Sequence, residues 1–562
     1  MEFKNKKVLF AGWGADNKAD TYMHQIWAYT LKKIFPKLIT FDTKENYFQE
    51  GKEKMNKNLL DIIKNEKPDC LIMAFFNDEL YLETLNEIKK INKRIKTILI
   101  SCDEDIKYED FYRFISLFFD YKIISQKQII PKYEKDGFKN LFQHLDFNTF
   151  NLKPIKIEKK YDVSFIGRPK ADRAEMIEYL VDNGINFVLF GWDWYNYPKL
   201  EKVYRGFLNA EDYNKVINQS KINLCFTKAG YTEESGLYNL KGKLFEVAEC
   251  RSFQLVEYFK PLLEFFQKGK EIMTFKTKEE LLKKVRYYLI NKKERENIAN
   301  NAYKKIITKY NREKDLIKIF NKIFKSKTTQ NVLPKVDKKI ISLSIGEISF
   351  EEEKIKEKIK DYDYVCFNNG KCKVSSYRKY MQAYSLQKTK KDISCCDYYV
   401  YSEKLGDLVL FRSEWAYRRA REEFHKLIDI NQLMVTKGFF LDNIPIFKDL
   451  FKNKVSSIIN KENTVFVSIP LIYVKNLRNI DYTEMKKVFE IRFMDRLFSL
   501  IYSKKLLSDK YLYILALESL NRKPFIIRYL LNSVFNKKNW DKLILNQKYL
   551  GNSPIRKFLK KF

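Results

Sequence analysis

The chain has 562 residues, and at roughly 100–200 residues per domain it predicts about three or four domains rather than one core. Hydrophobic residues make up 45% and aromatic residues 15% of the chain, which excludes wholesale disorder. No stretch approaches the ~18 consecutive apolar residues of a membrane-spanning helix.

The formal net charge of +34 has three explanations. It attracts nucleic acid, it attracts anionic lipid headgroups, or it reflects a lysine-rich composition spread over solvated helix faces. The lysines are dispersed and no nucleic-acid-binding motif occurs, so we expect no nucleic-acid partner and keep peripheral contact with an anionic membrane open. The first residues lack a secretory signal and run directly into an apolar strand. We therefore expect a cytoplasmic protein, with the inner membrane face as the alternative location.

The first 150 residues alternate apolar runs with amphipathic stretches. This alternation predicts a parallel sheet covered by helices on both faces. The predicted strands are Val8–Gly12, Leu38–Phe41, Pro68–Ala74, Thr97–Ser101 and Tyr121–Ser125, and predicted helices cover residues 22–35 and 56–64.

Two of these strands end in residues that are suited to binding a ligand. Gly12 and Gly14 form a G-x-G turn after the first strand, which indicates either a phosphate-binding loop or a bare tight turn. Asp103 and Asp105 follow the fourth strand, and side chains at the carboxyl end of a parallel strand face the ligand. One of the two carboxylates would be a general base toward an acceptor hydroxyl. The alternatives are solvated loop carboxylates or a helix cap.

A second α/β unit runs from Tyr161 to about Phe324. Its strands Tyr161–Gly167 and Phe187–Gly191 each stop at a glycine, which lets the backbone approach a ligand or makes a plain turn. Arg168 and Arg173 follow the first of these strands. A planar guanidinium is suited to bidentate contact with phosphate, although these arginines also fit ordinary surface positions beside a turn.

The same unit carries Lys241, Lys243 and Glu246 at the head of a predicted helix. The lysines would neutralise a phosphate, with Lys241 as the reserve candidate. Glu246 would accept hydrogen bonds from sugar hydroxyls, or it offsets the dipole of its helix. These residues together favour a pocket for a sugar nucleotide. The helices predicted to close the unit cover residues 278–290 and 294–310.

A polar linker (326–337) precedes a third region of mixed strands and helices (338–562), with predicted helices at residues 482–502 and 511–534. Four of the eight cysteines fall within this region, spaced C-x5-C…C-C. The spacing fits a tetrahedral zinc site poorly, so we favour buried thiols over a metal site. These cysteines are Cys366, Cys372, Cys395 and Cys396.

Residues 1–325 resemble the CgeB-like glycosyltransferases of the GT-B group. The resemblance rests on the acidic pair Asp103 and Asp105 and on several segments in order along the chain. These segments are 133–140, 161–167 with Arg173, 220–224, 243–246, 266–272 and 287–295.

Residues 335–562 are faintly similar to a degenerate GT-A glycosyltransferase domain, with Asn368 and Asn369 where such enzymes carry metal-binding carboxylates. Neutral amides bind divalent ions weakly, so the similarity implies a domain that has lost its metal.

The resemblance implies an α/β fold of two facing Rossmann-like domains, an acceptor-side domain (1–150) and a donor domain (151–325), plus the third α/β domain. It implies transfer of a sugar from a nucleotide-sugar donor to a glycan, lipid-linked or protein acceptor, without a metal or other cofactor. Surface polysaccharide or capsule assembly is the implied setting, by analogy. Glu246 would bind the nucleotide ribose. Two alternatives stay open: a non-catalytic carbohydrate- or partner-binding scaffold, and a membrane- or nucleic-acid-binding adaptor.

Overall fold

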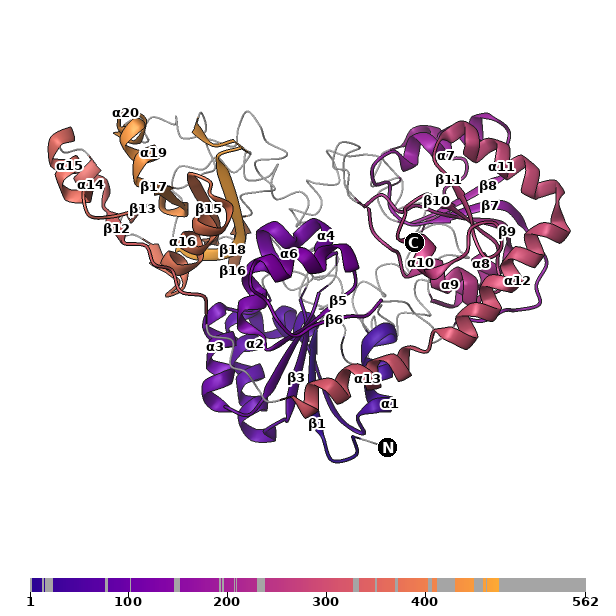
Figure 1. Cartoon of the computed structure of the whole chain (residues 1–562), viewed down its shortest axis with the longest axis horizontal. Coiled ribbons are helices and arrows are strands. Elements are labelled where there is room, and N and C mark those ends of the chain that lie inside the picture. The colour runs from indigo at the N-terminus through magenta and orange to yellow at the C-terminus, as the bar shows by residue number, and fades with distance from the viewer. Residues whose placement is uncertain are drawn as a thin grey trace, which may run out of the picture.

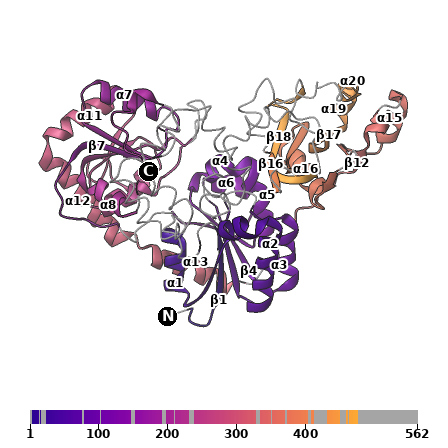
Figure 2. The same ribbon diagram turned by 180° about the vertical axis from the view of Figure 1, so that it is seen from behind.

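Three sheets divide the described chain into three domains, and Figures 1 and 2 show the first domain lying between the other two. Gly14, Asn369 and the helices predicted over residues 482–502 and 511–534 lie outside the described residues. The computed structural model describes residues 3–12, 15, 24–75, 79–101, 103–145, 152–191, 194, 197–206, 208, 210–229, 238–326, 333–348, 351–368, 372–402, 407–411, 430–448, 458–460 and 462–474.

The first sheet is parallel, with six strands in the order β2-β1-β3-β4-β5-β6. Its central strands are buried at every position because helices cover both faces, which confirms the expectation from their continuous apolar sequence. The strands are β1 (Lys7–Gly12), β2 (Lys37–Asp42), β3 (Cys70–Ala74), β4 (Lys96–Ile100), β5 (Tyr121–Ile124) and β6 (Leu141–Gln143).

Helices from two distant parts of the sequence cover the first sheet. On one face α2 (Thr43–Glu66) and α3 (Leu82–Ile91) bury their apolar sides. The opposite face is covered by α1 (Tyr29–Ile34) and, from far along the chain, by α13 (Arg312–Lys325). Although the sequence placed α13 in the second unit, its apolar side packs on the first sheet, and Figure 1 shows it reaching back from the second domain. The chain therefore crosses between the two domains twice.

The second sheet is also parallel, with five strands in the order β11-β10-β9-β7-β8. Numbered within each domain, both sheets share the order 2-1-3-4-5. The strands are β7 (Tyr161–Ile166), β8 (Phe187–Phe190), β9 (Ser220–Cys225), β10 (Gln254–Glu257) and β11 (Met273–Phe275). The helices are α7 (Arg173–Asp182), α8 (Ala210–Gln219), α9 (Lys243–Glu249), α10 (Leu262–Phe265), α11 (Lys278–Ile290) and α12 (Lys292–Lys309).

The third sheet is mixed and has seven strands, in the order β12-β13-β17-β15-β18-β14 with β16 paired to β15. Helix α16 (Arg378–Thr389) packs against β15 and β18. Cys366, Cys395 and Cys396 are buried thiols in its strands, as expected, whereas Cys372 is only partly buried. The strands are β12 (Ile340–Leu343), β13 (Tyr364–Phe367), β14 (Cys372–Val374), β15 (Ile393–Ser402), β16 (Asp407–Phe411), β17 (Leu433–Thr436) and β18 (Thr464–Val474).

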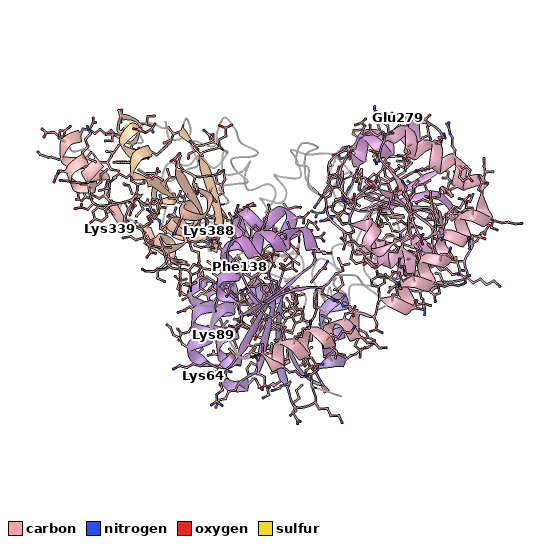
Figure 3. All side chains as sticks on the ribbon, in the orientation of Figure 1. Lys64, Lys89, Phe138, Glu279, Lys339 and Lys388 are labelled. Carbon is pink, nitrogen blue, oxygen red and sulfur yellow. The ribbon has the colours of Figure 1, made fainter. Side chains whose placement is uncertain are left out.

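The third domain shares a hydrophobic core with the first. A single cluster of buried apolar side chains includes Phe114 and Leu117 from the first domain and Tyr384 and Leu471 from the third. Polar contacts lie at the same junction: the carboxylate of Glu83 accepts hydrogen bonds from Ser375 Oγ at 2.7 Å and from Ser376 at 3.0 and 3.1 Å. Lys388, labelled in Figure 3, lies at this junction and donates to the main-chain oxygen of Asp136 at 3.3 Å.

The two Rossmann-like domains and the third α/β domain thus confirm the fold class expected from the sequence, with the two-domain arrangement of the GT-B group. Among the helices that the structure describes, none is both long enough and apolar enough to cross a bilayer.

Candidate functional site at the junction of the first two domains

Strand order places the candidate site in each of the first two domains. In an open parallel sheet, ligands bind beyond the carboxyl ends of the two strands where the order reverses. Those strands are β1 and β3 in the first sheet and β7 and β9 in the second. Gly12 ends β1, where its Cα lies opposite Ala74 of β3. Gly14, its predicted partner, lies outside the described residues.

Gly167 and Gly191 follow β7 and β8, and only glycine fits the close approach of the chain at these two positions. Gly191 has a φ of +132°, and a Cβ atom there would lie 2.0 Å from the carbonyl oxygen of Gly167. A Cβ on Gly167 would lie 2.7 Å from the ring of Phe165. Close packing therefore explains both glycines, and the loop that leaves Gly167 leads through Arg168 toward α7.

Arg173, the first residue of α7, ties the β7–α7 loop to the end of β9. Its side chain is buried at 5% exposure and donates to the carbonyl oxygens of Arg168 at 3.0 Å and Lys228 at 2.6 Å. Burial lowers the pKa of the guanidinium to about 10. Arg173 thus shapes the loop through two main-chain contacts, whereas the side chain of Arg168 is exposed.

Lys243 and Glu246 lie on the first turns of α9, beside the same strand end. The Lys243 ammonium donates to the carbonyl oxygen of Ile166 at 2.8 Å and lies 4.7 Å from the centre of the Phe165 ring. Burial lowers its pKa to about 8. Glu246 is buried at 6% exposure and accepts a hydrogen bond from the Tyr213 hydroxyl at 2.5 Å. The guanidinium of Arg173 also lies 5.8 Å from the Phe165 ring, so Arg173 and Lys243 both lie beside the end of β7.

Two further lysines face the first domain, and sequence reasoning singled out only one of them. Lys241, the reserve candidate, precedes α9, and Lys170 lies in the β7–α7 loop. Burial lowers the pKa of both, to about 8 for Lys241, while the nearby carboxylates of Asp103 and Asp105 oppose this lowering. Lys170 lies two residues after Arg168. Its place in this loop was the only feature of the sequence that could have pointed to it. The two lysines bring positive charge from the second domain to the carboxylates of the first domain.

The predicted acidic pair lies on the first-domain side of this junction. Asp103 is exposed and adopts a left-handed conformation (φ 53°) immediately before α4 (Glu104–Lys107). Asp105 is 8% exposed and accepts a hydrogen bond at 3.0 Å from the side-chain amide of Asn239 of the donor domain. Its Oδ1 atom is buried without a hydrogen-bond partner in the described part of the chain. Burial raises the pKa of the Asp105 carboxyl. No sequence signal pointed to Asn239.

Glu104, between the two aspartates, anchors their helix rather than facing the junction. It is fully buried and accepts hydrogen bonds from the main-chain N–H of Ser125 at 2.6 Å and of Gln126 at 2.9 Å. These contacts join the end of β4 to the end of β5. Asp103 and Asp105 are therefore carried by a helix whose start is fixed to the sheet.

Around Arg378, buried polar groups of the third domain form an internal network. Buried Arg378 donates to Gln382 and to the carbonyl oxygens of Phe367 and Leu433. Within the described ranges, no group of three or more His, Cys, Asp or Glu side chains is placed to hold a metal ion.

A family model matches part of the chain. Residues 170–320, which span most of the donor domain and the start of α13, match a family model described as glycosyl transferase-like. No curated protein matches the chain.

Several solved structures share part of the fold. TarM of S. aureus is 13% identical over 48% of this chain and 58% of its own length, with a TM-score of 0.37. The chain therefore spans less than two thirds of TarM. HepE of Anabaena, solved with UDP and glucose, is 10% identical over 57% of this chain and all of its own, with a TM-score of 0.43. Sucrose-phosphate synthase of Thermosynechococcus elongatus is 9% identical over 57% of this chain and 99% of its own length, also with a TM-score of 0.43.

Proposed function

We propose that the chain is a glycosyltransferase that moves a sugar from a nucleotide-sugar donor to a glycan, lipid-linked glycan or protein acceptor. The observation that carries the proposal is the meeting of two opposite charges at the domain junction. Asp103 and Asp105 come from the first domain, and Lys170 and Lys241 come from the second. The match of residues 170–320 to a glycosyl transferase-like family model supports the same reading.

In this proposal the second domain stabilises the leaving group and the first domain supplies the general base. Lys241 and Lys170, together with the exposed side chain of Arg168, stabilise the negative charge that develops on the departing diphosphate. Arg173 and Lys243 support the same loop through main-chain contacts. Because protein cations do this work, we propose that the reaction needs no divalent metal.

Asp105 is the proposed general base. Burial raises the pKa of its carboxyl and so makes the carboxylate a stronger base toward an acceptor hydroxyl, provided that the reaction inverts the anomeric carbon. Its partnerless Oδ1 atom takes the proton, while the Asn239 amide holds Oδ2. The exposed Asp103 orients the acceptor. Gly12 and Gly14 would approach the donor phosphates from the first domain.

The proposed setting is the cytoplasm or the inner membrane face, in surface polysaccharide or capsule assembly. The lysine-rich surface would then make peripheral contact with anionic lipid.

A thermal-shift panel of UDP-, GDP-, CMP- and ADP-linked sugars tests the proposal. A bound donor raises the melting temperature because it binds the folded state. Donor turnover should follow with the same nucleotide and should survive EDTA. Strict dependence on Mn²⁺ would move the reaction to the third domain. Binding without turnover on any acceptor would favour a non-catalytic carbohydrate-binding scaffold.

Glu246→Ala should weaken donor binding by about 1–3 kcal/mol, because a ribose hydroxyl would lose its buried acceptor. Isothermal titration of the identified donor measures this loss. Glu279→Ala, an exposed first-turn glutamate of α11, is the matched control and should bind normally. Unchanged affinity in Glu246→Ala would remove the ribose assignment.

A further inference from the structure

Three consecutive residues of the donor domain contact the first domain. The Asn239 amide donates to Asp105 Oδ2 at 3.0 Å. The N–H of Leu240 donates to Gln126 Oε1 at 2.8 Å, and Gln126 Nε2 donates to the carbonyl oxygen of Leu240 at 3.0 Å. Lys241 follows, within electrostatic reach of Asp103 and Asp105. The middle contact uses only main-chain atoms of the donor domain and is flanked on both sides by residues of the candidate site.

Contacts within the first domain hold Gln126 in place. Its side chain is 4% exposed, its own N–H is bound by Glu104 at 2.9 Å, and its Nε2 also donates to Ser125 Oγ at 3.1 Å. Glu104 begins the helix that carries Asp105. One rigid assembly of the first domain therefore holds both the proposed base and the amide that binds Leu240.

A side-chain amide offers one acceptor and a pair of donors, which matches the N–H and C=O of a single residue. Leu240 is itself 5% exposed, so loss of the Gln126 amide would leave both of its main-chain groups buried and unpaired. The neighbouring cross-domain ion pair is different. Lys127 and Glu264 pair at 2.8 Å with side chains 59% and 50% exposed, a type of contact that contributes little.

We propose that Gln126 is a positioning residue: by binding the main chain of Leu240 it clasps the donor domain onto the first domain and sets Lys241 opposite Asp105. The clasp itself is a property of this structure, whereas its effect on catalysis rests on the proposed function. In the clasped state the reacting groups are assembled together. In its absence the diphosphate-stabilising lysine is separated from the base.

The test compares Gln126→Ala and Gln126→Met with Lys127→Ala in the full chain. Methionine retains most of the glutamine volume without its hydrogen bonds, so agreement between the two Gln126 variants isolates the lost bonds from lost packing. A fluorophore pair at positions 64 and 279, exposed residues of the first and second domains labelled in Figure 3, reports the interdomain distance without any substrate. Thermal unfolding checks that every variant is folded.

Both Gln126 variants should shift the distance distribution to longer values, and Lys127→Ala should match the parent chain. With the donor identified, kcat should fall at least tenfold in both Gln126 variants while the donor KM changes less than threefold. The pH at which kcat falls on the alkaline side should also move upward as Lys241 becomes hydrated.

Two results would overturn the inference. An unchanged distance distribution in both Gln126 variants would remove the clasp. Longer distances with an unchanged kcat and pH profile would remove the positioning role. If the parent chain turns over no donor but the distances still shift, the proposed function and the positioning role fail, and the clasp stands alone as an interdomain contact.

Discussion

Lys241 and Lys243 lie two residues apart, and burial lowers the pKa of each to about 8. Their surroundings differ, because Lys243 donates to a carbonyl oxygen within its own domain whereas Lys241 faces the carboxylates of the other domain. The difference separates a lysine that supports the loop from one that we propose stabilises the leaving group. The proposed role of Lys241 can therefore be tested through the pH dependence of the reaction rate.

Lys241→Arg should abolish the alkaline fall of the reaction rate. A lysine whose folded-state pKa is lowered to about 8 loses its charge as pH rises through 8, and the charged fraction then falls roughly tenfold per pH unit. Arginine stays protonated throughout this range. Measurement of kcat/KM between pH 7 and 10 should therefore show a decline in the parent chain and a flat profile in Lys241→Arg. Lys243→Arg is the control and should keep the decline; the opposite pattern would assign the cation to Lys243.

The residue types at the candidate site could be read from the sequence, but their orientations could not. The strand that precedes Arg173 and the helix that begins at Lys243 were both predicted, and Arg173 and Lys243 lie beside the end of β7. The orientation of Arg173 toward Lys228, 55 residues further along the chain, depends on how β7 and β9 pair in space. Asn239 gave no signal because its contact with Asp105 spans 134 residues and two domains.

Among the elements, the strands were predicted best. Continuous apolar runs identified seven of the eleven parallel strands of the first two domains, namely β1 to β5, β7 and β8, and the helix predicted at residues 278–290 matches α11 at both ends. The early helix was less regular than its apolar spacing indicated: residues 24–28 form a π-helical turn before α1 begins. Spacing alone could not show this turn, since a π-helix and an α-helix bury similar faces.

The contact between the ends of β7 and β8 leads to a prediction about Gly191. Gly191→Ala should lower the free energy of unfolding by about 3 kcal/mol or more, because the new methyl group would overlap the Gly167 carbonyl in addition to straining the backbone. Gly184→Ala measures the cost of backbone strain alone, because Gly184 has a φ of +79° and nothing lies within 4 Å of the added Cβ.

Urea unfolding of both variants measures the difference. Gly184→Ala should lose only about 1–2 kcal/mol, the cost of a left-handed conformation. Equal losses in the two variants would show that the strand ends adapt to the methyl group.

For the whole molecule, the distribution of buried apolar residues predicts how the domains unfold. The first and third domains share one hydrophobic cluster, whereas the donor domain has clusters of its own. Calorimetry should therefore resolve two transitions, one for the donor domain and one for the first and third domains together. Leu471→Ala, in the shared cluster, should lower only the joint transition, and the identified donor should raise the donor-domain transition. Three separate transitions would contradict this shared core.

The third domain was the part of the molecule that sequence reasoning described least well. The mixed pairing of β15 with three neighbours depends on contacts between residues tens of positions apart. The fusion of this domain to the first domain depends on contacts hundreds of residues apart. Asn368, the predicted remnant of a metal motif, directly follows β13. Its neighbour Asn369 lies outside the described residues.

The position of α13 has a consequence for synthesis on the ribosome. The first domain is assembled from residues 3–145 together with α13, so part of one sheet face stays uncovered until residue 325 has left the exit tunnel. The donor domain, by contrast, is encoded in one uninterrupted segment and has all its strands earlier. The nascent chain should consequently complete its second domain before its first, and a chaperone that shields apolar surface would be needed on the first sheet during that interval.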